Sequence, residues 1–368
     1  MKSILKASVF LLLKGLLRLF KLIDKTDIGT LSIITDAYED VYRCHIITER
    51  YGLYPSKQYV PTKIKTITRE KELAIVIQGV IEEKDDYTLE TVRLYKKLFP
   101  HAAIIISTWD NTKDVLLEKF RAEGCEIVLS KNFDICGLGN VNYQICTSLA
   151  GIKRAKELGA SYVIKNRSDL RIHREFTFEY LKALVETNPV EKGEIPLKGR
   201  IITFAGFSGQ LFYTNWYQDF FYFGYTEDLL DFFDIPYNDR QGSARRSSLY
   251  MKEKYNGIYT GADMCSERVP EVYITTSFLS KYIPYEDSVK FSWEYHRKYF
   301  LVIDFSSIGA IWNKYGRKRL SIENDGTHQI EDYTKNINQL FSSALITNQI
   351  KYEEWMEQER AKIVLRPQ

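Results

Sequence analysis

Lys165, Arg167 and Asp169 are the residues whose types and spacing best suit chemistry on a charged ligand. They alternate at the end of a segment expected to be extended, and alternate side chains of a strand share one face. Lysine and arginine pair with phosphate oxygens, and a carboxylate can hold a divalent ion that bridges those oxygens. This spacing therefore indicates a diphosphate site. The structural alternative is an ion pair at the rim of a sheet.

Four further residues are weaker candidates, and each has an equally simple structural role. Asp219 precedes the aromatic run FFYFG, where it either acts as a base or ends a loop. Glu267 and Glu271 lie near the start of a predicted helix, where the helix dipole favours carboxylates in any case. Trp109 follows a predicted strand, where it either stacks on a nucleobase or packs in the core.

The composition and the missing motifs exclude several classes of protein. The 368 residues are 45% apolar and 27% charged, as in ordinary globular proteins, and such a chain can bury a core without disulfides. The five cysteines form no C-x-x-C pair, which indicates reduced thiols in the cytosol. The sequence has no H-E-x-x-H, G-x-S-x-G or Walker motif, and its net charge of +3 is too small to indicate a nucleic-acid binder.

The first 25 residues are basic and amphipathic. They hold six lysines and arginines against Asp24 alone, a net charge of +5, so the rest of the chain carries −2. On a helix an apolar stripe faces one side, and the other side carries Lys14, Arg18, Lys21 and Lys25. The longest uncharged run is too short to span a bilayer, so we expect a helix lying on an anionic membrane surface. The alternative is a helix packed on its own domain or on a partner subunit.

Apolar runs alternate with amphipathic segments from residue 73 onward. The predicted strands cover residues 73–77, 102–106, 126–129 and 161–164, and the helices between them cover 85–98, 114–123 and 140–158. This alternation predicts a doubly wound, mostly parallel sheet, which binds ligands beyond the carboxyl ends of its strands. No G-x-G-x-x-G follows the first strand, which disfavours a nicotinamide-binding Rossmann domain.

The chain after residue 171 has an α+β pattern. Helices are predicted at 175–187, 226–233, 266–282 with Ser266 as a cap, and 330–362. Strands are predicted at 200–204, 210–214, 220–223 and 300–304, the first two as a hairpin. The segment 238–248 is polar and is expected to be mobile.

Separated motifs of this sequence resemble the WavE lipopolysaccharide synthesis family. They occur in the family's order and cover about residues 72–310: IVIQGVI, DYTLETVRLYKKLFP with AIIISTW, NVNYQICTSLAGI, YVIKNRSDLRI, DFFYFGYTEDLLDFF, VPEVYITTSFL and YFLVIDFSSIG. The resemblance implies a glycosyltransferase of the GT-A type. The expected fold is therefore α/β, a GT-A-like doubly wound, mostly parallel sheet with an α+β C-terminal half.

The resemblance also implies roles for individual residues. Those expected to bind the donor nucleotide sugar are Gln78, Gly79, Ser107, Thr108, Trp109, Asn140, Asn142, Gln144, Lys165, Arg167 and Asp169. Those expected to act as the acid–base groups are Asp219 and Glu271. The resemblance leaves open which of the two carboxylates takes the acceptor's proton, and whether the enzyme inverts or retains the anomeric configuration.

One departure from the usual GT-A pattern concerns the metal. The signature Asp-x-Asp is replaced here by Arg167-Ser168-Asp169, so only the second carboxylate is present. The resemblance implies a divalent cation, Mn or Mg, at Asp169. We expect its role to be partial, because Arg167 can supply part of the positive charge.

These expectations give a provisional description of the whole chain. We expect a membrane-surface helix (1–25), a connector (26–72), a nucleotide-sugar-binding half (72–171), an acceptor and catalytic half (172–310) and a C-terminal helical extension (311–368). The partners would be a nucleotide-sugar donor, a glycan or lipid-linked glycan acceptor and the inner face of the bacterial inner membrane, with no nucleic acid. Two rival functions are a phosphotransferase acting on a nucleotide-activated polyol or sugar phosphate, and a non-catalytic subunit.

Overall fold

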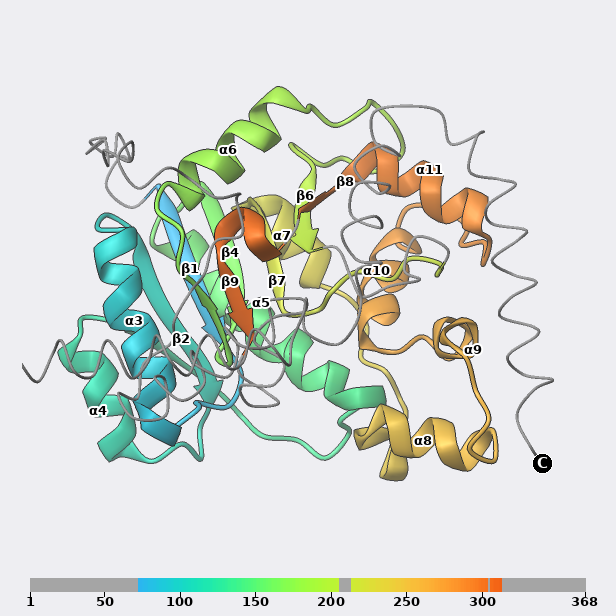
Figure 1. Cartoon of the computed structure of the whole chain (residues 1–368), viewed down its shortest axis with the longest axis horizontal. Coiled ribbons are helices and arrows are strands. Elements are labelled where there is room, and N and C mark those ends of the chain that lie inside the picture. Colours follow the sequence, from blue (N-terminus) through green and yellow to red (C-terminus); the bar gives the residue numbers. More distant parts are fainter. Residues whose placement is uncertain (1–71, 205–212, 304, 313–368) are drawn as a thin grey trace, which may run out of the picture. The chain divides into compact units, whose positions relative to one another are not determined.

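The computed structural model describes residues 72–204, 213–303 and 305–312 of the chain (Figure 1). The chain divides into two compact units, residues 1–62 and 63–368, and all described residues belong to the second unit. The predicted helix at 1–25, the connector up to residue 71 and the helices predicted at 330–362 lie outside the described residues.

A seven-stranded sheet forms the centre of the described unit, with the strand order β3-β2-β1-β4-β7-β6-β8. The strands are β1 (Leu73–Gln78), β2 (Ala103–Trp109), β3 (Glu126–Ser130), β4 (Tyr162–Arg167), β6 (Ile201–Phe204), β7 (Phe221–Tyr225) and β8 (Phe300–Ile303). Strand β7 runs antiparallel to both its neighbours, and the other pairs are parallel. The predicted doubly wound, mostly parallel sheet is therefore confirmed.

A second, two-stranded sheet joins β5 (Leu170–Ile172) to β9 (Ala310–Trp312) in antiparallel register. Strand β5 follows β4 after a turn of two residues, so the small sheet lies next to the carboxyl end of β4. Residues 311 and 312, which we assigned to the C-terminal extension, thus belong to the described α/β unit.

The helices connect these strands and flank the sheet. They are α3 (Tyr87–Leu98), α4 (Asp114–Ala122), α5 (Val141–Glu157), α6 (Thr177–Thr187), α7 (Thr226–Phe233), α8 (Ser247–Lys254), α9 (Gly261–Ser266), α10 (Pro270–Leu279) and α11 (Val289–Tyr299). In the view of Figure 1, α3 and α4 lie at the left of the sheet, and α8, α9 and α11 lie at its right. Short 3-10 turns cover Lys84–Asp86 (η1), Leu138–Asn140 (η2), Gly242–Arg245 (η4) and Phe305–Ile308 (η5).

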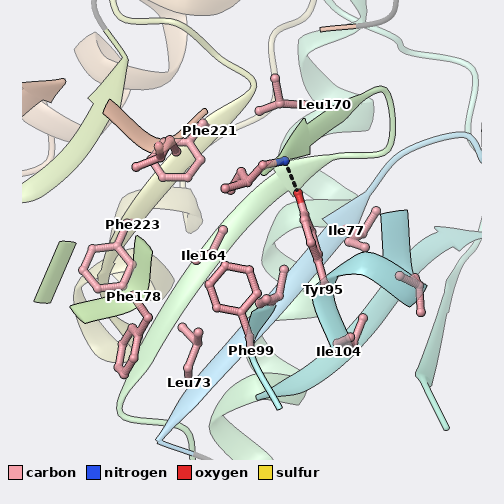
Figure 2. Packing of buried hydrophobic residues seen from close by; sticks show 14 of the residues in the cluster. Leu73, Ile77, Tyr95, Phe99, Ile104, Ile164, Leu170, Phe178, Phe221 and Phe223 are labelled. Carbon is pink, nitrogen blue, oxygen red and sulfur yellow. Dashed lines mark hydrogen bonds between the residues drawn. The ribbon is translucent and has the colours of Figure 1, made fainter. Parts of the chain in front are cut away.

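Alternate residues of the central strands supply two hydrophobic cores, one on each face of the sheet. In β1, Leu73, Ile75 and Ile77 pack with α3, α4 and α6, and Figure 2 shows part of this first core. Ala74 and Val76 face the other way, toward α5, α7 and α10. Burial on both faces explains why these strands are continuous apolar runs in the sequence.

A glycine lets helix α5 pack directly on the strands. A Cβ built on Gly151 would lie 2.3 Å from Cγ1 of Val76 and 3.0 Å from Cβ of Ser107, so no larger residue fits there without a shift. This close packing brings the N-terminal turn of α5 to the carboxyl edge of the sheet, where ligands bind in folds of this class.

Three local predictions were wrong. Residues 213 and 214 lie in a bend and a turn instead of a strand, and β6 pairs with β7 and β8. The helix predicted at 266–282 is two helices, because Pro270 cannot continue α9 and starts α10, with Arg268 at φ 52° between them. Ser266 therefore ends α9 and caps nothing at α10.

No helix of the described ranges is both long and apolar enough to cross a bilayer.

Candidate functional site

The carboxyl ends of β1, β2 and β4 meet through backbone hydrogen bonds. The Gly79 N–H donates to the Ser107 carbonyl over 3.0 Å, and the Ser168 N–H donates to the Gln78 carbonyl over 3.1 Å. Gly79 has a φ of +105°, a conformation that residues with a Cβ rarely adopt. The glycine lets the chain turn away directly after β1, so the structure places Gln78, Gly79 and Ser107 together at this edge.

The polar side chains at these strand ends bind protein atoms. The Thr147 hydroxyl of α5 donates to Gln78 Oε1 over 2.8 Å, and the Ser107 hydroxyl donates to the Thr147 carbonyl over 2.6 Å. The Thr108 and Thr112 hydroxyl oxygens lie 3.3 Å apart. These contacts fasten α5 and the following loop to the strand ends, and the contact of Gln78, Ser107 and Thr108 with a nucleotide stays a prediction.

Trp109 lies in a cluster of aromatic rings at the end of β2. Its ring is 7% exposed and meets Phe133 and Tyr143 edge to face, with ring centroids 6.2 and 5.1 Å apart. Phe133 in turn stacks on Tyr237, which is 51% exposed. These contacts give Trp109 a packing role, and its stacking on a nucleobase stays a prediction.

Asn142 and Asn140 differ in what their side chains contact. Asn142 is buried and donates to the Ile135 and Asn238 carbonyls over 2.8 and 2.7 Å, and it accepts from the Asn238 N–H over 2.7 Å. It thus ties the loop before α5 to the segment after α7. Asn140 precedes α5 with a φ of 63°, and its buried Oδ1 has no hydrogen-bond partner among the described residues.

Lys165 points into the protein. Its side chain is fully buried on the α5 side of the sheet, where Nζ lies 5.5 Å from the centre of the Tyr222 ring and 5.7 Å from that of Phe233. Nζ donates to the Asp219 carbonyl over 2.5 Å, and Gln144 Nε2 donates to the same carbonyl. Burial lowers the pKa of Lys165 to about 7, a shift that the Asp219 carboxylate partly counteracts.

Arg167 makes a bidentate ion pair with Asp169 at the end of β4. Nε donates to Oδ1 over 3.0 Å and Nη2 donates to Oδ2 over 2.8 Å. Trp312 of β9 also donates to Asp169 Oδ2, from Nε1 over 3.1 Å, and its ring lies 5.8 Å from Arg167 Cζ. The Arg167 side chain stays 21% exposed, so the pair forms part of the surface.

Two more carboxylates act on the same guanidinium. Asp219 Oδ1 lies 3.7 Å from Arg167 Nη1, and the Asp219 side chain is 13% exposed. Burial acts to lower the pKa of Arg167, but the charges of Asp169, Asp219 and Glu271 raise it above its ordinary value. The structure thus brings three predicted residues together, the carboxylates of Asp169 and Asp219 at the Arg167 guanidinium, and the charge of Glu271 also acts on that guanidinium.

The residues present do not form a complete metal site. Both oxygens of Asp169 accept hydrogen bonds, from Arg167 and Trp312. Within the part of the chain that the structure describes, no group of three His, Cys, Asp or Glu side chains could hold a metal ion. A divalent cation needs about six oxygen ligands, so most of them would have to come from elsewhere.

The remaining acidic candidate has a structural role. Glu267 is buried and pairs with Arg240 over 3.1 Å and Lys254 over 2.5 Å, and it accepts from the Tyr250 and Tyr255 hydroxyls. Burial acts to raise the pKa of Glu267, but its hydrogen bonds lower it below its ordinary value. Glu267 therefore joins α8 to α9.

Comparison with known proteins identifies the family. The model of the WavE lipopolysaccharide synthesis family matches residues 73–359, which is most of the chain. The chain belongs to the WavE family. The match extends past residue 310, where the motifs found in the sequence ended. A comparison with curated protein sequences found no match.

Solved structures resemble this WavE protein only weakly. One is the mannose-1-phosphate geranyltransferase of Thermus thermophilus, with 11% identity over 56% of this chain and 71% of that chain, and a TM-score of 0.29. A cytidylyltransferase of Leptospira borgpetersenii serovar Hardjo-bovis shares 13% identity over 81% and 98%, with a TM-score of 0.29. A glycosyltransferase involved in the glycosylation of the major capsid of PBCV-1 shares 9% over 63% and 81%, with a TM-score of 0.25. TM-scores this low support no argument about function.

Trp312 is the site residue of this WavE protein that the sequence analysis missed. Its Nε1 binds Asp169, and its ring stacks on Phe220, the residue after Asp219, with centroids 5.1 Å apart. It reaches the site because β9 pairs with β5, which brings residues about 140 positions apart in the sequence into register. The only local signal is the short apolar run Ala310–Trp312 after Gly309.

Proposed function

We propose that this WavE protein is a GT-A-type glycosyltransferase that transfers a sugar from a nucleotide-sugar donor to a bacterial surface glycan, such as a lipopolysaccharide core or a capsule. The observation that carries the proposal is the Arg167 guanidinium at the carboxyl end of β4, next to the carboxylates of Asp169 and Asp219. The charge of Glu271 also acts on this guanidinium. Membership of a lipopolysaccharide synthesis family supports the acceptor class.

The charges of this group suit glycosyl transfer. A guanidinium can stabilise the charge that develops on a diphosphate leaving group, which then needs no acid to protonate it. The sugar carbon gains oxocarbenium character in the transition state, and nearby carboxylates stabilise that positive charge. The same carboxylates can take the proton from the acceptor hydroxyl.

Asp219 is our first choice for the base. Hydrogen bonds from Lys165 and Gln144 hold its backbone carbonyl, and its carboxylate lies next to the Arg167 guanidinium. A base held in this way needs little reorganisation when the acceptor binds. Glu271, in the first turn of α10, is the second choice.

The donor site is tested by nucleotide binding and by donor turnover. The full-length protein is titrated with UDP, GDP, CMP and CDP in a thermal-shift panel, with and without manganese. The nucleotide that binds is then offered as its sugar conjugates with a surface-glycan acceptor. We expect a shift with one nucleotide, release of that nucleotide during turnover and a glycosidic bond in the product.

Other outcomes would favour the rival functions. A phosphodiester in the product would identify a phosphotransferase. A protein that binds none of the four nucleotides would be a non-catalytic subunit. Glu118→Gln, which removes an exposed carboxylate from α4, is the matched control. It should bind the nucleotide and turn over the nucleotide-sugar donor as the wild type does.

A further inference from the structure

We infer that Lys165 and Gln144 are positioning residues that hold the Asp219 segment, and that they do not contact the donor. The inference rests on the proposed function, because it assigns Asp219 a role in the transfer. It changes the expected role of both residues, which the resemblance to the WavE family placed among the ligands of the donor.

The first observation is that two side chains from different elements share one acceptor. Lys165 Nζ from β4 and Gln144 Nε2 from α5 both donate to the Asp219 carbonyl. The next carbonyl along the chain, that of Phe220, accepts from the Arg167 N–H over 3.1 Å. Donors from strand β4 and helix α5 thus make hydrogen bonds to two successive carbonyls just before β7 begins.

The second observation is the position of these hydrogen-bonded carbonyls relative to the sheet. The ladder between β4 and β7 ends with Asn166 opposite Phe221, so Asp219 lies beyond the last paired residue of β7. A carbonyl at such a position has no strand partner, and a buried carbonyl without a partner costs about 1–3 kcal/mol. Lys165 and Gln144 replace the missing partner and fix the backbone from which the Asp219 carboxylate extends toward Arg167.

The third observation is that neither side chain is exposed enough to serve a ligand. Lys165 is 0% exposed and Gln144 is 8% exposed, whereas the Arg167 side chain is 21% exposed. The Lys165 ammonium lies 5.5 Å from the centre of the Tyr222 ring and 5.7 Å from that of the Phe233 ring, and burial of a charge is unfavourable unless the charge is well bound. The hydrogen bond to the Asp219 carbonyl offsets part of this cost.

Steady-state kinetics separates a positioning role from a ligand role. In Lys165→Met and in Gln144→Leu we expect kcat to fall by about 10–100-fold, because a small displacement of a reacting group costs rates of this order. The dissociation constant of the donor nucleotide should stay within about twofold of the wild-type value, because no phosphate contact is lost. The double variant should lose less than the product of the two single losses, since both side chains bind one carbonyl.

Ser148→Ala is the matched control. Ser148 lies on α5 one turn after Gln144, is fully buried, and its hydroxyl has no hydrogen-bond partner among the described residues. Its removal deletes a buried polar group from the same helix without touching the Asp219 segment. We expect an unchanged kcat and an unchanged nucleotide affinity.

Hydrogen exchange tests, without relying on activity, whether Lys165 and Gln144 hold the Asp219 segment in place. Lys165→Met should raise the exchange rate of peptides that cover residues 217–221, and Ser148→Ala should not. Faster exchange in Lys165→Met, combined with no turnover of any donor by the wild type, would support the positioning role of Lys165 and reject the proposed glycosyl transfer. If Lys165→Met fails to fold, Gln144→Leu carries both measurements.

Two results would overturn the inference. The first is a donor dissociation constant that rises tenfold or more in either variant while kcat is unchanged, which would make that residue a ligand. The second is wild-type kcat and wild-type exchange at residues 217–221 in both variants.

Discussion

At the scale of single residues, Arg167 is the cation on which the carboxylates of the candidate site act. Its guanidinium makes two hydrogen bonds to Asp169 and lies 3.7 Å from Asp219. The charge of Glu271 also acts on this cation, so carboxylates outnumber the guanidinium in this group. Their negative charge suits the stabilisation of a positively charged sugar carbon, and the guanidinium suits the diphosphate leaving group.

Arg167→Lys should impair the enzyme although it conserves the charge. A lysine ammonium cannot bind both oxygens of Asp169 in the planar, two-pronged geometry of a guanidinium. We expect kcat/KM of Arg167→Lys to be about 10²-fold below the wild-type value. Asp169→Ala should lower kcat/KM at least as much, because it leaves the guanidinium without its main partner. Donor turnover by the purified variants measures both. Wild-type rates with a wild-type melting temperature would show that the site lies elsewhere.

Replacement of the two candidate bases should affect the rate more than the affinity. Asp219→Asn and Glu271→Gln keep the shape of each side chain and remove its basicity. If the enzyme inverts, one of them should lose about 10²–10⁴-fold in kcat with little change in nucleotide affinity. Asp263→Asn serves as a comparison, since Asp263 closes a capping box with Thr260 at the start of α9 and is expected to act on stability alone. Normal rates in both base variants would exclude them from the acid–base step.

The metal prediction follows from the same charges. Asp169 has both oxygens engaged, so the protein alone should not bind manganese tightly, and any ion should be held mainly by the donor phosphates and water. Excess EDTA should therefore lower turnover without abolishing it. Calorimetric titration of Mn²⁺ with and without nucleotide checks the cause. Tight binding of Mn²⁺ by the protein alone would contradict this view.

At the scale of elements, local patterns in the sequence predict more of the fold than of the site. The apolar runs and helical spacings of residues 73–158 predict β1, β2, β3 and their helices within a few residues, because each pattern reflects burial on a known face. The order of β7, β6 and β8 depends on pairing between distant segments. Lys165 illustrates the same limit, because strand alternation gives its face but not the carbonyl that its ammonium reaches.

Tyr95 holds the elements that carry Asp169 in place. Its buried hydroxyl accepts a hydrogen bond from the Ile172 N–H over 3.0 Å (Figure 2). It also accepts one from Asn166 Nδ2 over 3.0 Å, and so joins α3 to β5 and β4. Tyr95→Phe should lower the free energy of unfolding by about 1–3 kcal/mol, because it leaves a buried N–H without its partner. Urea denaturation measures this loss. Thr187→Val, at the exposed end of α6, is a surface control that should change stability by less than about 0.5 kcal/mol.

At the scale of the whole molecule, the net positive charge and the candidate site lie in different parts of the chain. Residues 1–25 carry +5, and the rest of the chain carries −2. The candidate site lies within residues 72–312, and the family match begins only at residue 73. This separation favours independent functions, membrane attachment by the first segment and transfer by the α/β unit.

Deletion of residues 1–25 should release the protein from anionic vesicles and leave its nucleotide affinity unchanged. Each basic residue near an anionic leaflet contributes about 1 kcal/mol, and the apolar side of the helix adds burial in the interface. Replacement of Lys14, Arg18, Lys21 and Lys25 by glutamate should have nearly the same effect, and salt should weaken binding in part because it screens the charges. Co-sedimentation with vesicles of anionic and of neutral lipid measures the attachment. A truncated protein that still sediments with anionic vesicles would place the attachment elsewhere in the chain, and a truncated protein that unfolds would show that the segment packs on its own domain.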